Sequence, residues 1–179
     1  MLPRRPPPPN NVRSLFPLFC LAATLLAGCG YRVGPAGGQT AGAQSITVNP
    51  VVNRTLEAGV SDALAQSLRQ SLQRDGTYRL ATSEPGDLVV NTTITDYRRA
   101  GVSYQSGNVL TVQDYRLTLT AHVTAKERAS GKVVLDRTVT GFTLVRVGAD
   151  LNQAERQALP LATTDLAQSI TTLLVDGKW

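Results

Sequence analysis

The chain has 179 residues, of which 42% are hydrophobic and 17% are charged, with a formal net charge of +5. This composition indicates a globular protein and excludes a largely disordered chain. Three of the basic residues lie within the first 13 positions, and the remaining 15 face 13 acidic residues, a balance too weak to indicate nucleic-acid binding.

The N-terminal segment is typical of a bacterial lipoprotein signal peptide. Arginines and prolines precede an apolar run of 13 residues, 15–27, which leads into Leu26-Ala27-Gly28-Cys29. This run is shorter than the roughly 20 residues that a membrane-spanning helix needs. We predict that 1–28 is removed and that Cys29 becomes the first residue, carrying S-diacylglycerol and N-palmitoyl groups. An ordinary secretory signal and an uncleaved anchor helix are the alternatives.

The composition after the signal agrees with a lipid-anchored protein. The other cysteine, Cys20, lies within the signal, so the mature chain has neither a disulfide within the chain nor a cysteine metal cluster. Gly30 is not the aspartate that retains many lipoproteins in the inner membrane, which favours the outer membrane. Small and turn-forming residues predict a flexible tether over 29–44, followed by a single domain over 45–179.

The first half of the domain predicts a strand, a helix and two further strands. Apolar residues alternate with polar ones in 45–52, which predicts the first strand. The helix is expected over 57–74, where Val60, Leu64, Leu68 and Leu72 recur every fourth residue. The further strands are expected over 78–82 and 87–97.

The second half predicts a hairpin and a C-terminal helical region. Residues 115–126 alternate without a break, and 133–145 returns as the partner strand. Phe142 and Leu144 continue the apolar series of this strand in the other phase, which predicts a bulge at Gly141. Pro160 is expected to interrupt the helical region 152–175. These elements predict an α+β fold with two helices on one face of a mostly antiparallel or mixed sheet of about four strands.

The sequence does not predict an enzyme. His122 is the only histidine, it lies in the middle of a threonine-rich strand, and no Gly-x-Ser-x-Gly turn is present. The carboxylates and the histidine do not have the spacing of a metal site, and we expect no cofactor. A periplasmic hydrolase stays open as an alternative, but no nucleophile can be named for it.

Five basic residues are candidates for binding an anionic ligand. Arg98 and Arg99 end one strand, and Lys126, Arg128 and Lys132 flank the hairpin turn. Paired strands could bring some of these ends together as an anion-binding rim. The alternative is a charged sheet edge that prevents aggregation.

The order of these elements resembles the LptE family of lipopolysaccharide-assembly lipoproteins. The resemblance rests on Cys29-Gly30-Tyr31-Arg32-Val33, on Val51-Val52-Asn53-Arg54-Thr55 before the first helix, and on Asp75-Gly76-Thr77-Tyr78-Arg79-Leu80 after it. It continues through residues 87–98, Tyr115-Arg116-Leu117-Thr118-Leu119 and the turn at Gly131-Lys132-Val133-Val134. It therefore covers essentially the whole mature chain.

The resemblance implies a function as well as a fold. LptE-like proteins have two helices on a sheet of about four strands and plug the outer-membrane β-barrel LptD, and the two proteins together insert lipopolysaccharide into the outer leaflet. The resemblance implies lipopolysaccharide binding by basic residues, for which Arg98, Arg99, Lys126, Arg128 and Lys132 are the candidates by position. We expect a lipid-anchored protein on the periplasmic face of the outer membrane. An accessory lipoprotein of another envelope complex is the alternative.

Overall fold

The computed structural model describes residues 42–147 and 150–176. These residues belong to one compact unit, Gly34–Trp179. The predicted signal peptide, Cys29 and most of the predicted tether lie outside the described residues, so their interpretation stays a prediction.

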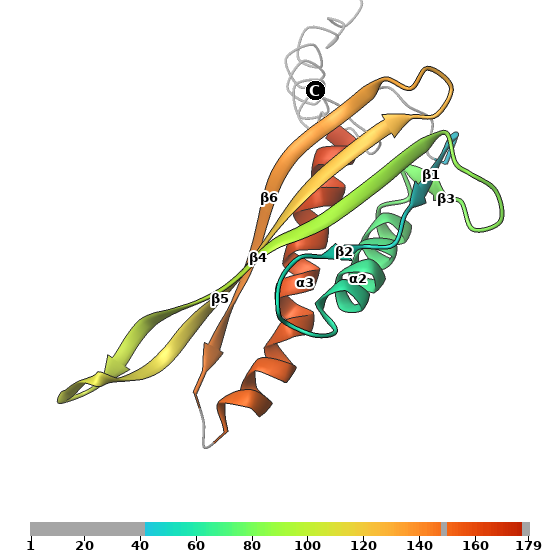
Figure 1. Ribbon diagram of the computed structural model, residues 1–179. Coiled ribbons are helices and arrows are strands. Elements are labelled where there is room, and N and C mark those ends of the chain that lie inside the picture. The colour runs from blue at the N-terminus through green and yellow to red at the C-terminus, as the bar shows by residue number, and fades with distance from the viewer. Residues whose placement is uncertain (1–41, 148–149, 177–179) are drawn as a thin grey trace, which may run out of the picture. The chain divides into compact units, whose positions relative to one another are not determined.

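A mixed sheet of six strands forms one layer of the unit (Figure 1). The strand order is β3-β1-β4-β5-β6, and β2 also pairs with β4. The pairs β1–β3, β1–β4 and β2–β4 are parallel, whereas β4–β5 and β5–β6 are antiparallel. The strands are β1 Gln44–Val48, β2 Val52–Asn53, β3 Tyr78–Leu80, β4 Leu88–Gln105, β5 Asn108–Glu127 and β6 Val133–Arg146.

Two helices, α2 (Val60–Asp75) and α3 (Leu151–Asp176), cover one face of this sheet (Figure 1). The predicted α+β class and the two helices are confirmed, while the number of strands is six and not about four. The difference arises partly at Pro50, where the predicted strand 45–52 divides into β1 and β2.

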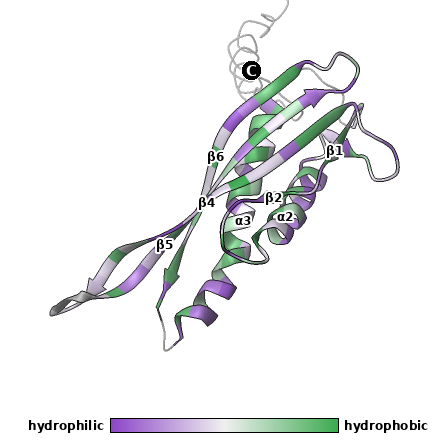
Figure 2. Cartoon of the chain, in the orientation of Figure 1, coloured by the Kyte–Doolittle hydropathy of each residue, from purple (hydrophilic) through white to green (hydrophobic). Residues whose placement is uncertain are grey.

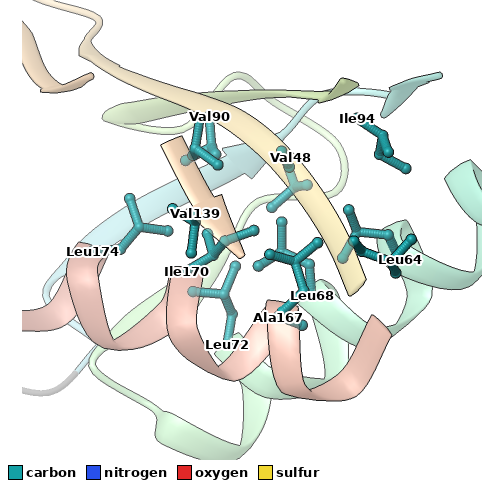
Figure 3. Close-up of a cluster of buried hydrophobic side chains, with 14 of the residues drawn as sticks. Val48, Leu64, Leu68, Leu72, Val90, Ile94, Val139, Ala167, Ile170 and Leu174 are labelled. Carbon is teal, nitrogen blue, oxygen red and sulfur yellow. The ribbon is translucent and has the colours of Figure 1, made fainter. Parts of the chain in front are cut away.

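Helix α2 begins and ends at glycines that adopt the left-handed conformation. Gly59 precedes it with φ 77°, and Gly76 follows it with φ 74° and donates its N–H to the carbonyl of Leu72. The start at Val60 lies three residues after the predicted one. The predicted stripe of Val60, Leu64, Leu68 and Leu72 is buried against the sheet and α3, and Figure 3 shows its three leucines among the core side chains.

Helix α3 runs without interruption through Pro160, so the predicted break is wrong. A proline in a helix removes one hydrogen bond, the one to the carbonyl four residues earlier. That carbonyl belongs to Arg156, and both Arg156 and Pro160 are exposed, so water can replace the lost partner. The apolar stripe of α3 continues on both sides, from Ala158 through Ala162 to Leu166.

The predicted bulge at Gly141 is also wrong, because Gly141 is itself a member of the buried series. It pairs with Leu119, within an unbroken register from Leu135 to Arg146. A β-carbon at this position would lie 2.4–2.5 Å from the backbone N and Cα of Leu166. Glycine therefore lets α3 pack directly against β6, and Phe142 points to the opposite face of the sheet.

Among the elements that the structure describes, none covers the face of the sheet away from the helices. In β5 the alternation predicted for 115–126 is confirmed, since Leu117, Leu119, Ala121, Val123 and Ala125 are buried while Thr118, Thr120, His122 and Thr124 are partly exposed. Hydrophobic and hydrophilic segments accordingly alternate along the strands in Figure 2. We call this surface the open face.

Strands β4 and β5 extend beyond the end of β6. The last pair between β5 and β6 joins Asp114 and Arg146, whereas β4 and β5 pair onward to Gln105 and Asn108. The projecting part is a two-stranded hairpin, visible at the lower left of Figure 1. We call this hairpin, residues 101–114, the arm.

Candidate functional site

The five predicted basic residues fall into two groups at different places on the sheet. Arg98 pairs with Thr118, and Arg99 pairs with Leu117, near the arm. Lys126 lies eight residues along β5 from Thr118, which corresponds to about 27 Å of strand. Arg128 and Lys132 lie beside Lys126 in the β5–β6 connection. The structure therefore brings Lys126, Arg128 and Lys132 together but does not unite them with the two arginines of β4.

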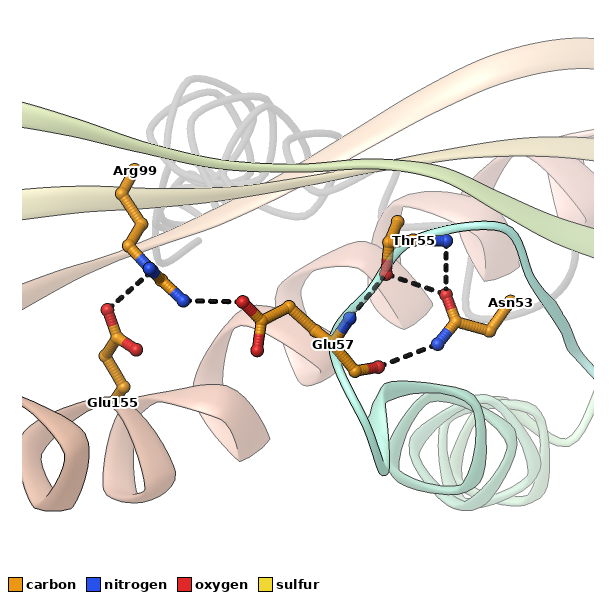
Figure 4. A network of polar contacts seen from close by, with 5 residues as sticks. All are labelled: Asn53, Thr55, Glu57, Arg99 and Glu155. Atoms are coloured by element: carbon orange, nitrogen blue, oxygen red, sulfur yellow. Dashed lines mark hydrogen bonds and ion pairs between the residues drawn. The ribbon is translucent and has the colours of Figure 1, made fainter.

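Arg99 lies on the helix-covered side and connects three parts of the chain. Its guanidinium forms ion pairs with Glu57, in the loop before α2, and with Glu155 of α3, where the N–O distance is 2.7 Å (Figure 4). It also lies over the ring of Tyr97, 5.3 Å from the centroid. Two carboxylates thus already neutralise Arg99, which leaves it the least available of the five residues for an external anion.

The loop that carries Glu57 is itself held in place by Asn53. The Asn53 amide donates to the Glu57 carbonyl at 2.7 Å, and its oxygen accepts from the N–H and hydroxyl of Thr55 (Figure 4). Burial, with the negative charge of Glu155 as a second cause, raises the pKa of the neighbouring Tyr97 hydroxyl. Tyr97 therefore stays neutral at physiological pH, and the network joins β4 to α3 and to the loop before α2.

Arg98 lies on the open face, where the structure adds residues that the sequence analysis did not identify. Its row across the sheet is Arg98, Thr118 and Phe142, and the next row is Ala100, Arg116 and Leu144. The Arg116 guanidinium lies over the Phe142 ring, 4.9 Å from its centroid. Phe142 and Leu144 are 50% and 59% exposed. We call Arg98, Arg116, Phe142 and Leu144 the open-face patch.

The open-face patch combines positive charge with exposed apolar area. Within the described part of the chain, no ion pair joins Arg98 or Arg116 to a carboxylate, although Asp96 lies on the same face. Arg146 differs, because it pairs with Asp114 at 3.0 Å. The Arg146 hydrogen bond, followed by the Ser103 hydrogen bond, holds the pKa of Asp114 below its usual value.

The open-face patch was not predicted from the sequence because a bulge was expected at Gly141. That bulge assigned Phe142 and Leu144 to the core, whereas regular alternation from Leu135 assigns them to the open face, on the same side as Arg116. The alternation in β5 could have predicted the open-face patch, because its partner strand β6 must follow the same two-residue period.

The second group of cations occupies the turn between β5 and β6. Lys126, Arg128 and Lys132 are exposed, and the turn is closed by N–H to carbonyl bonds from Glu127 to Lys132 and from Gly131 to Glu127. The Arg128 N–H donates to the Asp87 carbonyl at 2.8 Å, which joins the turn to the start of β4. We call residues 126–132 the basic turn.

Asp87 connects the basic turn to the start of β1. Its carboxylate accepts from the N–H and the hydroxyl of Ser45 at 2.9 and 2.7 Å. These two bonds, backbone first, lower the pKa of Asp87, and the positive charges of Arg128 and Arg79 lower it further. Asp87 is therefore an ionised anchor for this end of the sheet.

His122 lies on the open face with Asp136 as its acidic neighbour. Its Nε2 is 3.4 Å from an Asp136 oxygen, and Thr93 and Thr138 lie opposite it on the adjacent strands. Among the residues that the structure describes, no group of three His, Cys, Asp or Glu side chains could hold a metal ion. Nor does any helix in residues 42–147 and 150–176 have the length and apolar character needed to cross a membrane.

Comparisons with known proteins identify both a family and a fold. A family model described as "LptE: Lipopolysaccharide-assembly" matches residues 43–174. A search of curated protein sequences found no match.

Two solved structures resemble the fold at low sequence identity. A Xanthomonas campestris protein assigned to the DUF330 family superposes with a TM-score of 0.60 and 14% identity, covering 82% of this chain and 91% of that protein. A minor lipoprotein from Acinetobacter baumannii superposes with a TM-score of 0.50 and 22% identity, covering 73% of this chain and 91% of that one. At these identities the likeness establishes a shared fold.

Proposed function

The chain belongs to the LptE family of lipopolysaccharide-assembly proteins, and we propose that it is an outer-membrane lipoprotein that plugs and supports an LptD-like β-barrel. The barrel and this protein together insert lipopolysaccharide into the outer leaflet, and lipids on Cys29 hold the protein on the periplasmic face. The family match carries this proposal, because it begins at residue 43, near the end of the predicted tether, and includes nearly every described element.

The open face is a suitable surface for contact with the barrel wall. The two helices cover the other face of the sheet, and no other element of residues 42–147 and 150–176 lies over this broad surface (Figure 1). Its partly exposed threonines offer hydroxyl groups for hydrogen bonds, and Phe142 and Leu144 offer apolar area. A domain with this construction can occupy the inside of a partner while its core stays intact.

The proposed ligand, lipopolysaccharide, combines phosphate groups with acyl chains. Arginine binds phosphate through several N–H donors in one plane, and apolar side chains bind acyl groups. Arg98 fits this role on the open face, and Lys126, Arg128 and Lys132 supply positive charge at the basic turn. Arg99 is a weaker candidate because Glu57 and Glu155 already neutralise it.

Co-purification in mild detergent tests the plug. Tagged wild-type protein should bring down a large outer-membrane β-barrel, and its depletion should reduce surface lipopolysaccharide. Phe142→Asp with Leu144→Asp should weaken recovery of the barrel. Leu161→Asp, at a 60% exposed position on α3, is the matched control and should not. Recovery of no barrel with the wild-type protein would refute the plug.

Binding of labelled lipopolysaccharide to the purified complex tests the ligand. Arg98→Ala should weaken binding severalfold, whereas an equal loss in an Asn91→Ala control, on the same face of β4, would contradict the assignment.

Cys29→Ser should abolish lipid attachment, which the mass of the mature protein reports. An accessory role in another envelope complex is the alternative, and the identity of the co-purified partner separates the two.

A further inference from the structure

The basic turn lies at the end of the sheet where the chain enters the domain. β1 and β4 run parallel with Ile46 beside Leu88, and Leu88 pairs with Glu127 at the end of β5. The start of β1 and the β5–β6 connection therefore share one end of the sheet, at the upper right of Figure 1. Gly42, the first described residue, is also fixed there, because its N–H donates to the Thr77 carbonyl at 2.9 Å.

The charges at this end are arranged with the cations outward. Lys126, Arg128 and Lys132 are exposed, and within the described part of the chain none of them forms an ion pair. The one carboxylate of the turn, Glu127, accepts the Ser130 hydroxyl at 2.5 Å.

Neighbouring segments add charges of both signs. They contribute Arg74 and Arg79, and the carboxylates of Asp75, Glu84, Asp87 and Asp176, of which Asp87 is turned inward onto Ser45 and Asp176 lies near Val133. This end as a whole is therefore close to electrically balanced, and its local excess of positive charge lies in the basic turn, where three cations face one carboxylate.

The tip of the arm, at the opposite end of the sheet, carries no charged side chain. Between Gly101 and Gln113, the arm contains no lysine, arginine, aspartate or glutamate. The two tips of the long β-strands thus differ, because the basic turn carries three cations and the tip of the arm carries no charge.

The length of the tether restricts how far this end can lie from the anchor. Twelve residues lie between Cys29 and Gly42, so thirteen Cα–Cα steps join the two. Even fully extended, these steps span at most about 45 Å. A lipid on Cys29 would therefore keep the basic turn at a high local concentration near the membrane surface.

We propose that the basic turn contacts the anionic lipid headgroups of the leaflet that holds the Cys29 lipids, and so orients the domain with its arm pointing away from that surface. This inference rests on the proposed lipidation of Cys29. A cation near an anionic surface contributes about fivefold in partitioning, so three cations suffice to favour one orientation of a domain that is already tethered.

The test places a fluorescent probe at each end of the sheet in the full lipidated protein. Lipidation occupies Cys29, so an introduced cysteine is the single thiol of the mature chain. Ala129→Cys labels the exposed basic turn without removing a hydrogen-bonding side chain, and Ser106→Cys labels the tip of the arm as the control. The protein is reconstituted in vesicles of phosphatidylcholine with or without phosphatidylglycerol, with a headgroup-bound quencher.

We expect severalfold stronger quenching at position 129 in vesicles that contain phosphatidylglycerol than in vesicles of phosphatidylcholine alone. High salt should abolish this gain in quenching. The probe at position 106 should show little quenching in either lipid. Lys126→Glu, Arg128→Glu and Lys132→Glu together should remove the gain, while the protein stays attached to the vesicles. Equal quenching at 129 in both lipids, or equal quenching at 129 and 106, would overturn the contact. Failure of the protein to float with the vesicles would instead refute the lipid anchor and, with it, this inference.

Discussion

The carboxylate of Asp165 in α3 accepts the backbone N–H of Phe142 in β6 at 2.9 Å. β6 is the last strand of the sheet, and an edge strand normally presents unpaired N–H groups to other chains. A side chain of α3 thus accepts a hydrogen bond from one of the outward N–H groups of this edge. This bond lies next to Gly141, where α3 packs closely against β6.

Asp165→Ala should therefore expose the middle of the β6 edge. We expect a loss of about 1 kcal/mol in the free energy of unfolding and increased self-association at high protein concentration. Urea unfolding and light scattering measure the two effects. Gln168→Ala, at an exposed position on the same helix, is the control and should leave both unchanged.

Gly141→Ala should be strongly destabilising, because the added methyl group would meet the backbone of Leu166 and not a side chain that can move. We expect a loss of about 2–4 kcal/mol in the free energy of unfolding. Gly101→Ala is the matched control, since its β-carbon would meet only the Val112 and Tyr104 side chains at 3.1–3.5 Å. Comparable losses in the two variants would contradict the close contact between α3 and β6.

Thr92→Val should stabilise the protein. The Thr92 hydroxyl is buried in β4 and has no hydrogen-bond partner among the described residues. Valine has nearly the same shape and removes the unsatisfied polar atom, so we expect a gain of about 1–2 kcal/mol. Chemical denaturation measures it. Thr118→Val, on the open face, should change stability by less than about 0.5 kcal/mol.

The stabilising effect of ionised Asp87 should be lost in acid. Its pKa is lowered in the folded state, so its contribution is present above the ordinary aspartate value of about 3.9 and is lost as the pH falls through the folded value. Wild-type protein should therefore lose more stability than Asp87→Asn as the pH falls from about 5 toward 2. Denaturation curves across this range measure the difference, and Asp96→Asn controls for the loss of one negative charge.

The sequence predicted those elements whose burial follows a regular period. The alternation in β5 and the four-residue spacing in α2 each report which face meets the core, so both elements and the fold class could be predicted. Pro160 and Gly141 were misinterpreted because their effects depend on surroundings: the proline loses a bond on a solvated side, and the glycine makes room for Leu166.

The candidate site was less predictable because its contacts join distant parts of the chain. Glu57 and Glu155 reach Arg99 from 42 and 56 positions away, and no local pattern identifies such partners. The grouping of Lys126, Arg128 and Lys132 was accessible, since they flank one turn. Their position beside the start of β1 required the parallel pairing of β1 with β4.

The arm has a mechanical consequence. β6 ends its pairing with the arm at Asp114 and Arg146, where the Val147 N–H still donates to the Gln113 carbonyl, and three register shifts follow between Gly101 and Gln105. A two-stranded ribbon with an irregular ladder bends and twists at little energetic cost, while the six-stranded sheet behind it stays stiff. The domain thus combines a rigid body with an arm that bends easily. The arm can adjust to the shape of a partner without disturbing the packed helices.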